Sequence, residues 1–349
     1  MTKFNKRIQY IDALRGFTMI LVVFAHVLLW TFNLGNHETV IGSLFITFRM
    51  PMFFFISGYI SYKSTQLWTY SYYKENMLKK VFVQIVPALI FFVIYNTCQN
   101  RSLCEILQII LNKGFGIYWF TFALLMCFLL YYSISFFCRL LNKNLLDIIL
   151  IIFSMLGVLW LVVSEREGII YNIVSLDKVA KYFQFFALGL LCKKYNEIFL
   201  KIISSECVKT ILIISFLFLF YLSCNSCLEM SNGFLYSIVK DLLVRYAGLF
   251  VVFLFFLTKK DFFAGQNIIS KMLQFVGRRT LDIYLLHYFF IPVMPYISLY
   301  VAPSNMIIIQ LVFTLFITML IVCVCLLCSE ILRCSNTLSY ILFGCKVKC

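Results

Sequence analysis

Residues 7–30 read RIQYIDALRGFTMILVVFAHVLLW, and this stretch decides the fold class. From Gly16 to Trp30 almost every side chain is apolar, and a helix of roughly 20 such residues crosses the hydrocarbon core of a bilayer. The same composition continues along the chain, since 62% of its 349 residues are hydrophobic and 13% are charged. Because helices satisfy their own backbone hydrogen bonds away from water, we predict an all-α, polytopic membrane bundle that forms one domain over residues 1–349.

Apolar runs separated by polar breaks predict ten membrane spans. We expect them at residues 12–33, 41–62, 80–98, 117–138, 145–163, 178–192, 208–224, 235–257, 277–300 and 305–328. Lys and Arg concentrate in the segments that are cytoplasmic if the amino terminus is inside, as the positive-inside rule requires. Both termini are therefore expected in the cytoplasm. The first span is expected to be retained, because no small-residue cleavage site follows it.

Charge and cysteine usage exclude several other classes of protein. The net charge of +15 is spread over many short loops, so topology and anionic membrane lipids explain it, and we predict no nucleic-acid site. Most of the 14 cysteines lie within predicted spans, where a thiol behaves as a small apolar side chain. Cys224 and Cys227 fall at an outer loop, where a disulfide is chemically permitted, and this pairing stays open. No histidine or carboxylate pattern surrounds them, so we expect no metal site.

The first span carries a polar stripe. His26 lies eleven residues after Arg15, which in a helix places it within about 20° of the same face and about 16 Å further along the axis. Asp12 lies close to that face as well. A stripe of this kind is expected to face a cavity rather than lipid. A structural interpretation also stands, in which His26 only bonds a neighbouring helix and Arg15 extends to the membrane surface.

The second span adds a guanidinium at similar depth. It contains FRMPMFFFISGY, residues 48–59, and the short turn after the first span should bring Arg49 level with His26. An arginine at mid-membrane costs roughly 2.5 to 3.5 kcal/mol on insertion scales. Packing alone does not explain why the chain carries an arginine at this free-energy cost. We therefore predict a polar chamber in the bundle, with Pro51 and Gly58 loosening the helix beside it.

Spans eight and nine contribute further polar side chains to the predicted chamber. KDLLVR places Lys240, Asp241 and Arg245 in span eight, where Asp241 and Arg245 have the i,i+4 spacing of an ion pair. Mutual neutralisation and contact with a ligand remain equal alternatives for this pair. VGRRTLDIYLLHYFF places His287 in span nine, with a structural role slightly favoured.

These motifs together resemble a known family. The segments that carry the resemblance are YIDALRGFTMILVVFAH, FRMPMFFFISGY, YWFTFALL at 118–125, YFQFFALGLL at 182–191 and VGRRTLDIYLLH at 276–287. In order and spacing they resemble acyltransferase family 3, a family of integral membrane O-acyltransferases. The most specific element is an arginine and a histidine separated by ten residues, met here by Arg15 and His26.

The resemblance implies an activity and its substrates. It implies about ten membrane helices, a cytoplasmic acyl-coenzyme A donor, usually acetyl, and transfer to a sugar hydroxyl of a surface polysaccharide or its lipid-linked precursor. Subgroups similar to this sequence modify bacterial glycans, so the expected location is the bacterial plasma (inner) membrane. Family members often carry paired arginines before the third span that are thought to bind the phosphates of coenzyme A. In this chain Lys79 and Lys80 are the closest equivalents of those arginines. Lysine lacks the planar fork with which arginine binds a phosphate through two hydrogen bonds.

Acyl transfer to an alcohol needs a base for the hydroxyl proton and stabilisation of the oxyanion. We assign His26 as the base, with a transient acetyl-imidazole as the variant. Arg49 is expected at the reacting centre, and Arg15 is expected to orient coenzyme A. A transporter or flippase that uses the same charged cavity is the alternative from another class. The acceptor sugar, the acyl group and self-association stay open.

Overall fold

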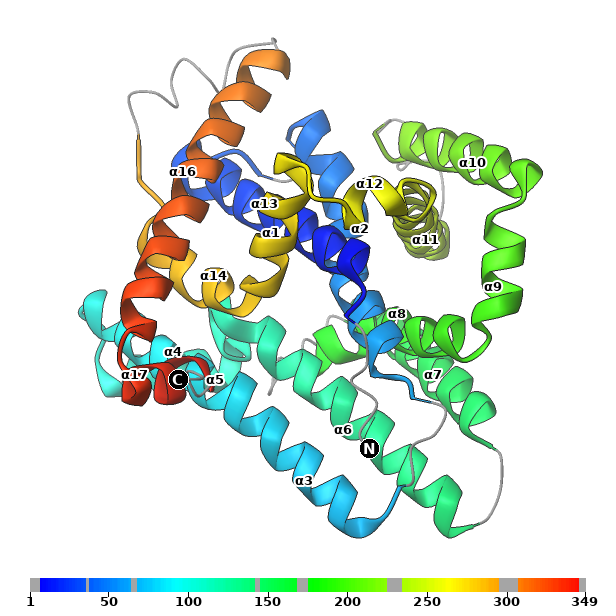
Figure 1. Cartoon of the computed structure of the whole chain (residues 1–349), viewed down its shortest axis with the longest axis horizontal. Helices are drawn as coiled ribbons and strands as arrows, with labels where there is room; N and C mark the ends of the chain where they lie inside the picture. Colours follow the sequence, from blue (N-terminus) through cyan, green and yellow to red (C-terminus); the bar gives the residue numbers. More distant parts are fainter. Residues whose placement is uncertain are drawn as a thin grey trace. The chain divides into compact units, whose positions relative to one another are not determined.

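The computed structural model describes residues 7–35, 38–63, 68–141, 145–167, 175–224, 234–294 and 307–344. Every regular element in these ranges is helical and none is a strand, so the all-α prediction is confirmed (Figure 1). In the described ranges, eight helices are long and apolar enough to cross a membrane: Gln9–Thr31, Val40–Ser61, Tyr70–Cys98, Leu103–Leu140, Leu146–Ser164, Glu206–Cys224, Tyr236–Thr258 and Ile307–Arg333. The chain is thus an integral membrane protein.

Two of the ten predicted spans are absent from those eight. The sixth is a helix, α8 (Leu176–Lys194), but lysines at both ends make it more polar than the others. The ninth was expected to be continuous over residues 277–300, and this prediction is wrong. Helix α13 (Ile268–Arg278) ends there, α14 (Thr280–Leu286) follows Arg279, and a 3-10 turn covers His287–Phe289.

The break in the ninth segment has a local cause. Gly277 has low helix propensity and lies one residue before the end of α13. Beyond the 3-10 turn, Pro292 has no N–H with which to continue a helix. Residues 291–294 are accordingly not helical, and 295–300 lie outside the described residues.

The chain divides into two compact units. Unit 1 comprises Met1–Phe53 and Glu197–Cys328, and unit 2 comprises Phe54–Asn196 and Ser329–Cys349. The long helices α2 (Val40–Ser61) and α16 (Ile307–Arg333) contribute residues to both. The prediction of one domain over the whole chain stays a prediction.

Unit 1 is built around α1 (Gln9–Thr31). This helix packs along α13, and it also contacts α11 (Phe234–Thr258), α12 (Lys260–Ala264) and α14 (Figure 1). The other close pair is α10 (Glu206–Cys224) with α11. Apolar side chains fill the inner face of α1, including Phe24 and Leu28.

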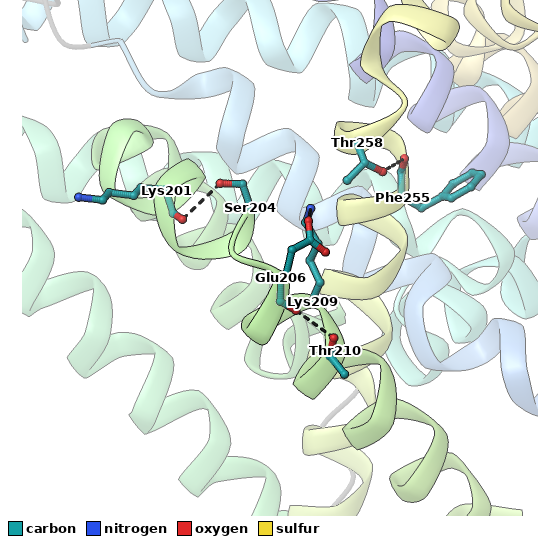
Figure 2. A network of polar contacts seen from close by, with 7 residues as sticks. All are labelled: Lys201, Ser204, Glu206, Lys209, Thr210, Phe255 and Thr258. Carbon is teal, nitrogen blue, oxygen red and sulfur yellow. Dashed lines mark hydrogen bonds and ion pairs between the residues drawn. The ribbon is translucent and has the colours of Figure 1, made fainter.

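Short polar contacts close the helix ends where α9 (Asn196–Ile203) meets α10 (Figure 2). The Ser204 hydroxyl donates to the Lys201 carbonyl at 3.3 Å, and Lys209 pairs with Glu206 at 2.6 Å. Thr258 makes a similar bond to the Phe255 carbonyl at the end of α11. The two hydroxyls thus bind backbone carbonyls near helix C-termini, where carbonyls lack partners within the helix, and the ion pair lies in the first turn of α10.

Unit 2 contains the remaining helices. They are α3 (Tyr70–Lys80), the π turn Val81–Ile85, α4 (Val86–Cys98), α5 (Leu103–Lys113), the 3-10 turn Gly116–Tyr118, α6 (Trp119–Leu140), α7 (Leu146–Glu167), α8 and α17 (Asn336–Phe343). Helices α6 and α7 both pack on α8, and Tyr182 of α8 stacks on Phe54 at 4.9 Å. The third span begins at Tyr70, ten residues before its predicted start, where the Thr69 side chain caps the helix.

The contact between α1 and α13 depends on two glycines. A Cβ at Gly16 would clash with the Leu273 carbonyl oxygen, and a Cβ at Gly277 would clash with the carbonyl oxygen of Asp12. Both clashes involve backbone, which cannot rotate away as a side chain can. The two helices can therefore approach this closely only without side chains at both positions.

We predict that Gly277→Ala destabilises the protein. Alanine favours a helix by about 1 kcal/mol over glycine, but the forced separation of α1 and α13 should cost more, about 1 to 3 kcal/mol as in other overpacked sites. Thermal unfolding in detergent measures the difference. Lys271→Ala, at an exposed position of the same helix, is the control and should leave the melting temperature nearly unchanged. A Gly277→Ala protein as stable as the parent would show that the close approach is not needed.

Candidate functional site

The first turns of α1 hold two of the predicted site residues at the crossing with α13. The Arg15 guanidinium donates to the Thr280 hydroxyl at 3.0 Å, which ties α1 to the start of α14. Asp12 is buried and forms an ion pair with Arg7 at 2.5 Å. The charge of Asp12 is therefore compensated from its own chain segment, and Arg15 remains partly exposed.

His26 lies near the other end of α1 among aromatic rings. Its Nε2 atom is 3.2 Å from the Tyr288 hydroxyl, which is hydrogen-bond distance. The ring centroids of Trp30, His287 and Tyr288 lie 5.6, 5.3 and 5.1 Å from its own. His26 is partly exposed, whereas Ala25 and Val27 beside it are buried. The imidazole is thus held on one side and accessible on another.

His287 is wholly buried next to His26. Its Nδ1 atom is 2.9 Å from the Ile283 carbonyl oxygen, which only accepts, so Nδ1 carries the proton and donates. Nε2 is then unprotonated, and it has no hydrogen-bond partner. A buried acceptor left without a donor costs about 1 to 3 kcal/mol, so this side chain is not explained by packing alone.

Arg49 lies in the part of α2 that belongs to unit 1. Its charge acts electrostatically on His26, as does the neighbouring His287. The predicted meeting of the guanidinium with the imidazole, and the chamber that both would line, stay predictions. Pro51 lies two residues further along the same helix.

Helix α11 carries the predicted pair of span eight. Arg245 Nε donates to Asp241 Oδ2 at 2.8 Å, and a second nitrogen of Arg245 lies 3.4 Å from the Ile46 carbonyl oxygen of α2. Arg245 is buried, whereas the Asp241 side chain is 42% exposed. The i,i+4 ion pair is thus formed. Lys240 is buried beside it, and contact of these three side chains with a ligand remains a prediction.

The residues predicted to bind coenzyme A phosphates lie in unit 2, at the end of α3. Lys79 is exposed, whereas the Lys80 ammonium lies 3.7 Å from the centroid of the Phe128 ring. A cation over an aromatic face is attracted by the ring quadrupole. Lys80 therefore has a partner within its own unit, and its role toward phosphate stays a prediction.

Sequence reasoning missed Tyr288, Thr280 and Trp30. All three contact a predicted site residue, yet none is charged. Tyr288 directly follows His287 in the segment VGRRTLDIYLLHYFF, and this position was the only signal in the sequence that could have pointed to it.

Metal binding and a disulfide are the remaining chemistries to place in the structure. Among the described residues no three His, Cys, Asp or Glu side chains are grouped as metal ligands. The Cys224 thiol is free and exposed, and Cys227 lies outside the described residues.

The sequence also matches a known family over nearly its whole length. A family model described as an acyltransferase domain, of family 3, matches residues 8–330, which is nearly the whole chain. The chain belongs to acyltransferase family 3. No curated protein and no solved structure gives a significant match. This chain is therefore a membrane acyltransferase, and both Arg15 and His26 lie in its unit 1.

We predict that His287→Leu lowers acyltransferase activity without lowering stability. The substitution removes the unpartnered Nε2 acceptor, and the Ile283 carbonyl keeps its bond from the backbone N–H of residue 287. The unfolding free energy should stay the same or rise by about 1 kcal/mol. Thermal unfolding together with acyl transfer in membranes measures both. A large loss of stability with normal activity per folded molecule would assign His287 to structure alone.

Proposed function

We propose that this acyltransferase moves an acyl group, acetyl in the simplest case, from cytoplasmic acyl-coenzyme A to a sugar hydroxyl. The acceptor would be a surface polysaccharide or its lipid-linked precursor, and the membrane would be the bacterial plasma membrane. The observation that carries the proposal is the partly exposed His26 imidazole, held by Tyr288 near the Arg49 charge inside an apolar helix of an acyltransferase.

The chemistry assigns His26 as general base. It takes the proton of the acceptor hydroxyl as the oxygen attacks the thioester carbonyl. The carbonyl carbon–sulfur bond then breaks, and the imidazolium returns the proton to the sulfur of coenzyme A. Histidine suits both transfers because its ordinary pKa lies near the working pH. Arg49 supplies positive charge where the oxyanion develops on the carbonyl.

Arg15 is proposed to orient the donor. It lies eleven residues before His26, about 16 Å along the helix axis, which is a span the pantetheine arm could bridge. Its bond to Thr280 fixes the guanidinium while leaving part of it exposed.

His26→Gln is the first test of the proposed function. Membranes containing the protein and the native glycan are incubated with labelled acetyl-coenzyme A, and label in the glycan is measured. Loss of a general base should lower transfer by about 10² to 10⁴-fold at equal protein level. His37→Gln, the same change at a histidine outside the motif, is the matched control and should transfer normally. Normal transfer by His26→Gln would remove the assignment, and intact thioester with every variant and the parent would favour a transporter.

Arg15→Lys tests the donor site separately. Lysine keeps the positive charge but loses the planar fork that binds phosphate or carboxylate in two places. We expect a higher KM for acyl-coenzyme A with a smaller change in kcat, measured from initial rates at varied donor concentration. A change in kcat alone would place Arg15 at the reacting centre instead.

A further inference from the structure

The two nitrogens of His26 differ in their surroundings. Nε2 lies at hydrogen-bond distance from the Tyr288 hydroxyl, and Nδ1 has no hydrogen-bond partner among the described residues. The ring is partly exposed, so a reactant can approach it from a side that Tyr288 does not occupy. The proposed function says that His26 is the base but leaves open which nitrogen accepts the proton.

The Tyr288 hydroxyl can either accept from Nε2 or donate to it, so the two neutral tautomers differ in which nitrogen is left bare. With its proton on Nε2, His26 donates to the Tyr288 oxygen, and Nδ1 is a bare acceptor on the side that Tyr288 does not occupy. With its proton on Nδ1, the bare nitrogen is Nε2, and it already accepts the Tyr288 O–H. Only the Nε2-protonated tautomer therefore offers a reactant a free nitrogen that can take a proton.

Tyr288 is itself held in place by rings. The centroid of His287 lies 3.9 Å from that of Tyr288, and the centroid of Trp30 lies 5.3 Å from it. His287 cannot turn freely, because its Nδ1 is bonded to the Ile283 carbonyl. The Tyr288 hydroxyl is therefore positioned by its neighbours before any ligand arrives.

We infer that Tyr288 is a positioning residue that fixes His26 in the Nε2-protonated tautomer, so that Nδ1 is the atom that takes the acceptor proton. This inference rests on the proposed function for its mechanistic meaning. When Nδ1 takes the hydroxyl proton, the imidazolium keeps its Nε2–H donated to the Tyr288 oxygen. The same Nδ1 proton is later given to the thiolate of coenzyme A.

Solid-state ¹⁵N NMR tests the tautomer without any substrate. The chain has three histidines, so the full-length protein labelled in histidine and embedded in lipid vesicles gives few signals. His26→Gln and His287→Gln variants assign them. We expect His26 to show a bare Nδ1 and a protonated Nε2 at neutral pH. A protonated Nδ1 and a bare Nε2 would overturn the inference.

Tyr288→Phe tests the cause of the preference. Without the hydroxyl, His26 should show both tautomers, whereas Tyr284→Phe, the same change one turn earlier, should keep the parent spectrum. A Tyr288→Phe spectrum identical to the parent would overturn the positioning role. Where Tyr288→Phe fails to fold, the parent spectrum alone still decides the tautomer.

The pH profile of acetyl transfer from labelled acetyl-coenzyme A to the native glycan gives a second readout. The charged and titratable groups that face His26 are Arg49 on α2 and His287 and Tyr288 in the 3-10 turn. Loss of the bond to the imidazolium makes that cation less stable, so it forms only at lower pH. The acid limb of Tyr288→Phe should move to lower pH, with kcat reduced about 10- to 100-fold. An unmoved limb with reduced protein level would indicate a structural role only.

The two hypotheses fail in different ways. If His26→Gln transfers normally while the parent shows the expected tautomer, the proposed function is wrong and the tautomer assignment stands. If His26→Gln is inactive but Nδ1 is protonated, only the inference about Tyr288 is wrong.

Discussion

The close approach of α1 to α13 at Gly16 and Gly277 is the constraint on which the rest of the site depends. The two glycines are 261 residues apart, and the same offset separates His26 from His287 and Thr31 from Pro292. The two segments therefore run in the same direction and in register. Each places a histidine ten residues beyond its glycine, so the backbone crossing decides which side chains meet. The register persists beyond the break at Arg279, because His26 and His287 still meet there. Arg15 binds Thr280 of the opposite segment, next to this break.

Two buried charges of unit 1 are compensated by ion pairs on the same chain segment. Asp12 pairs with Arg7, and Arg245 pairs with Asp241. These local ion pairs offset the desolvation free energy of the buried charges. His26 and His287 differ, because one is partly exposed inside an apolar helix and the other leaves a buried nitrogen without a donor. A polar ring inside an apolar helix and a buried nitrogen without a donor are the features most informative about function in a membrane protein.

The helices and the motif could be predicted from the sequence, because apolar length and the spacing of Arg15 and His26 are local properties. The break after Arg278 was missed although Gly277 and Pro292 flank it, because the TLDIYLLHYFF between them is nearly as apolar as a continuous span. Tyr288 is one of 21 tyrosines, and only its contact with His26 distinguishes it. Likewise Gly16 and Gly277 have meaning only as a pair, and sequence patterns do not reveal which distant segments pack together.

The central claim is that α1 and the segment after Gly277 meet so that His26 and Tyr288 interact. A double-mutant cycle of His26→Ala and Tyr288→Phe on the unfolding free energy tests it most directly. Residues in contact show coupling of about 0.5 to 3 kcal/mol, and we expect a value in that range. Additive effects, with coupling below about 0.3 kcal/mol, would contradict the account.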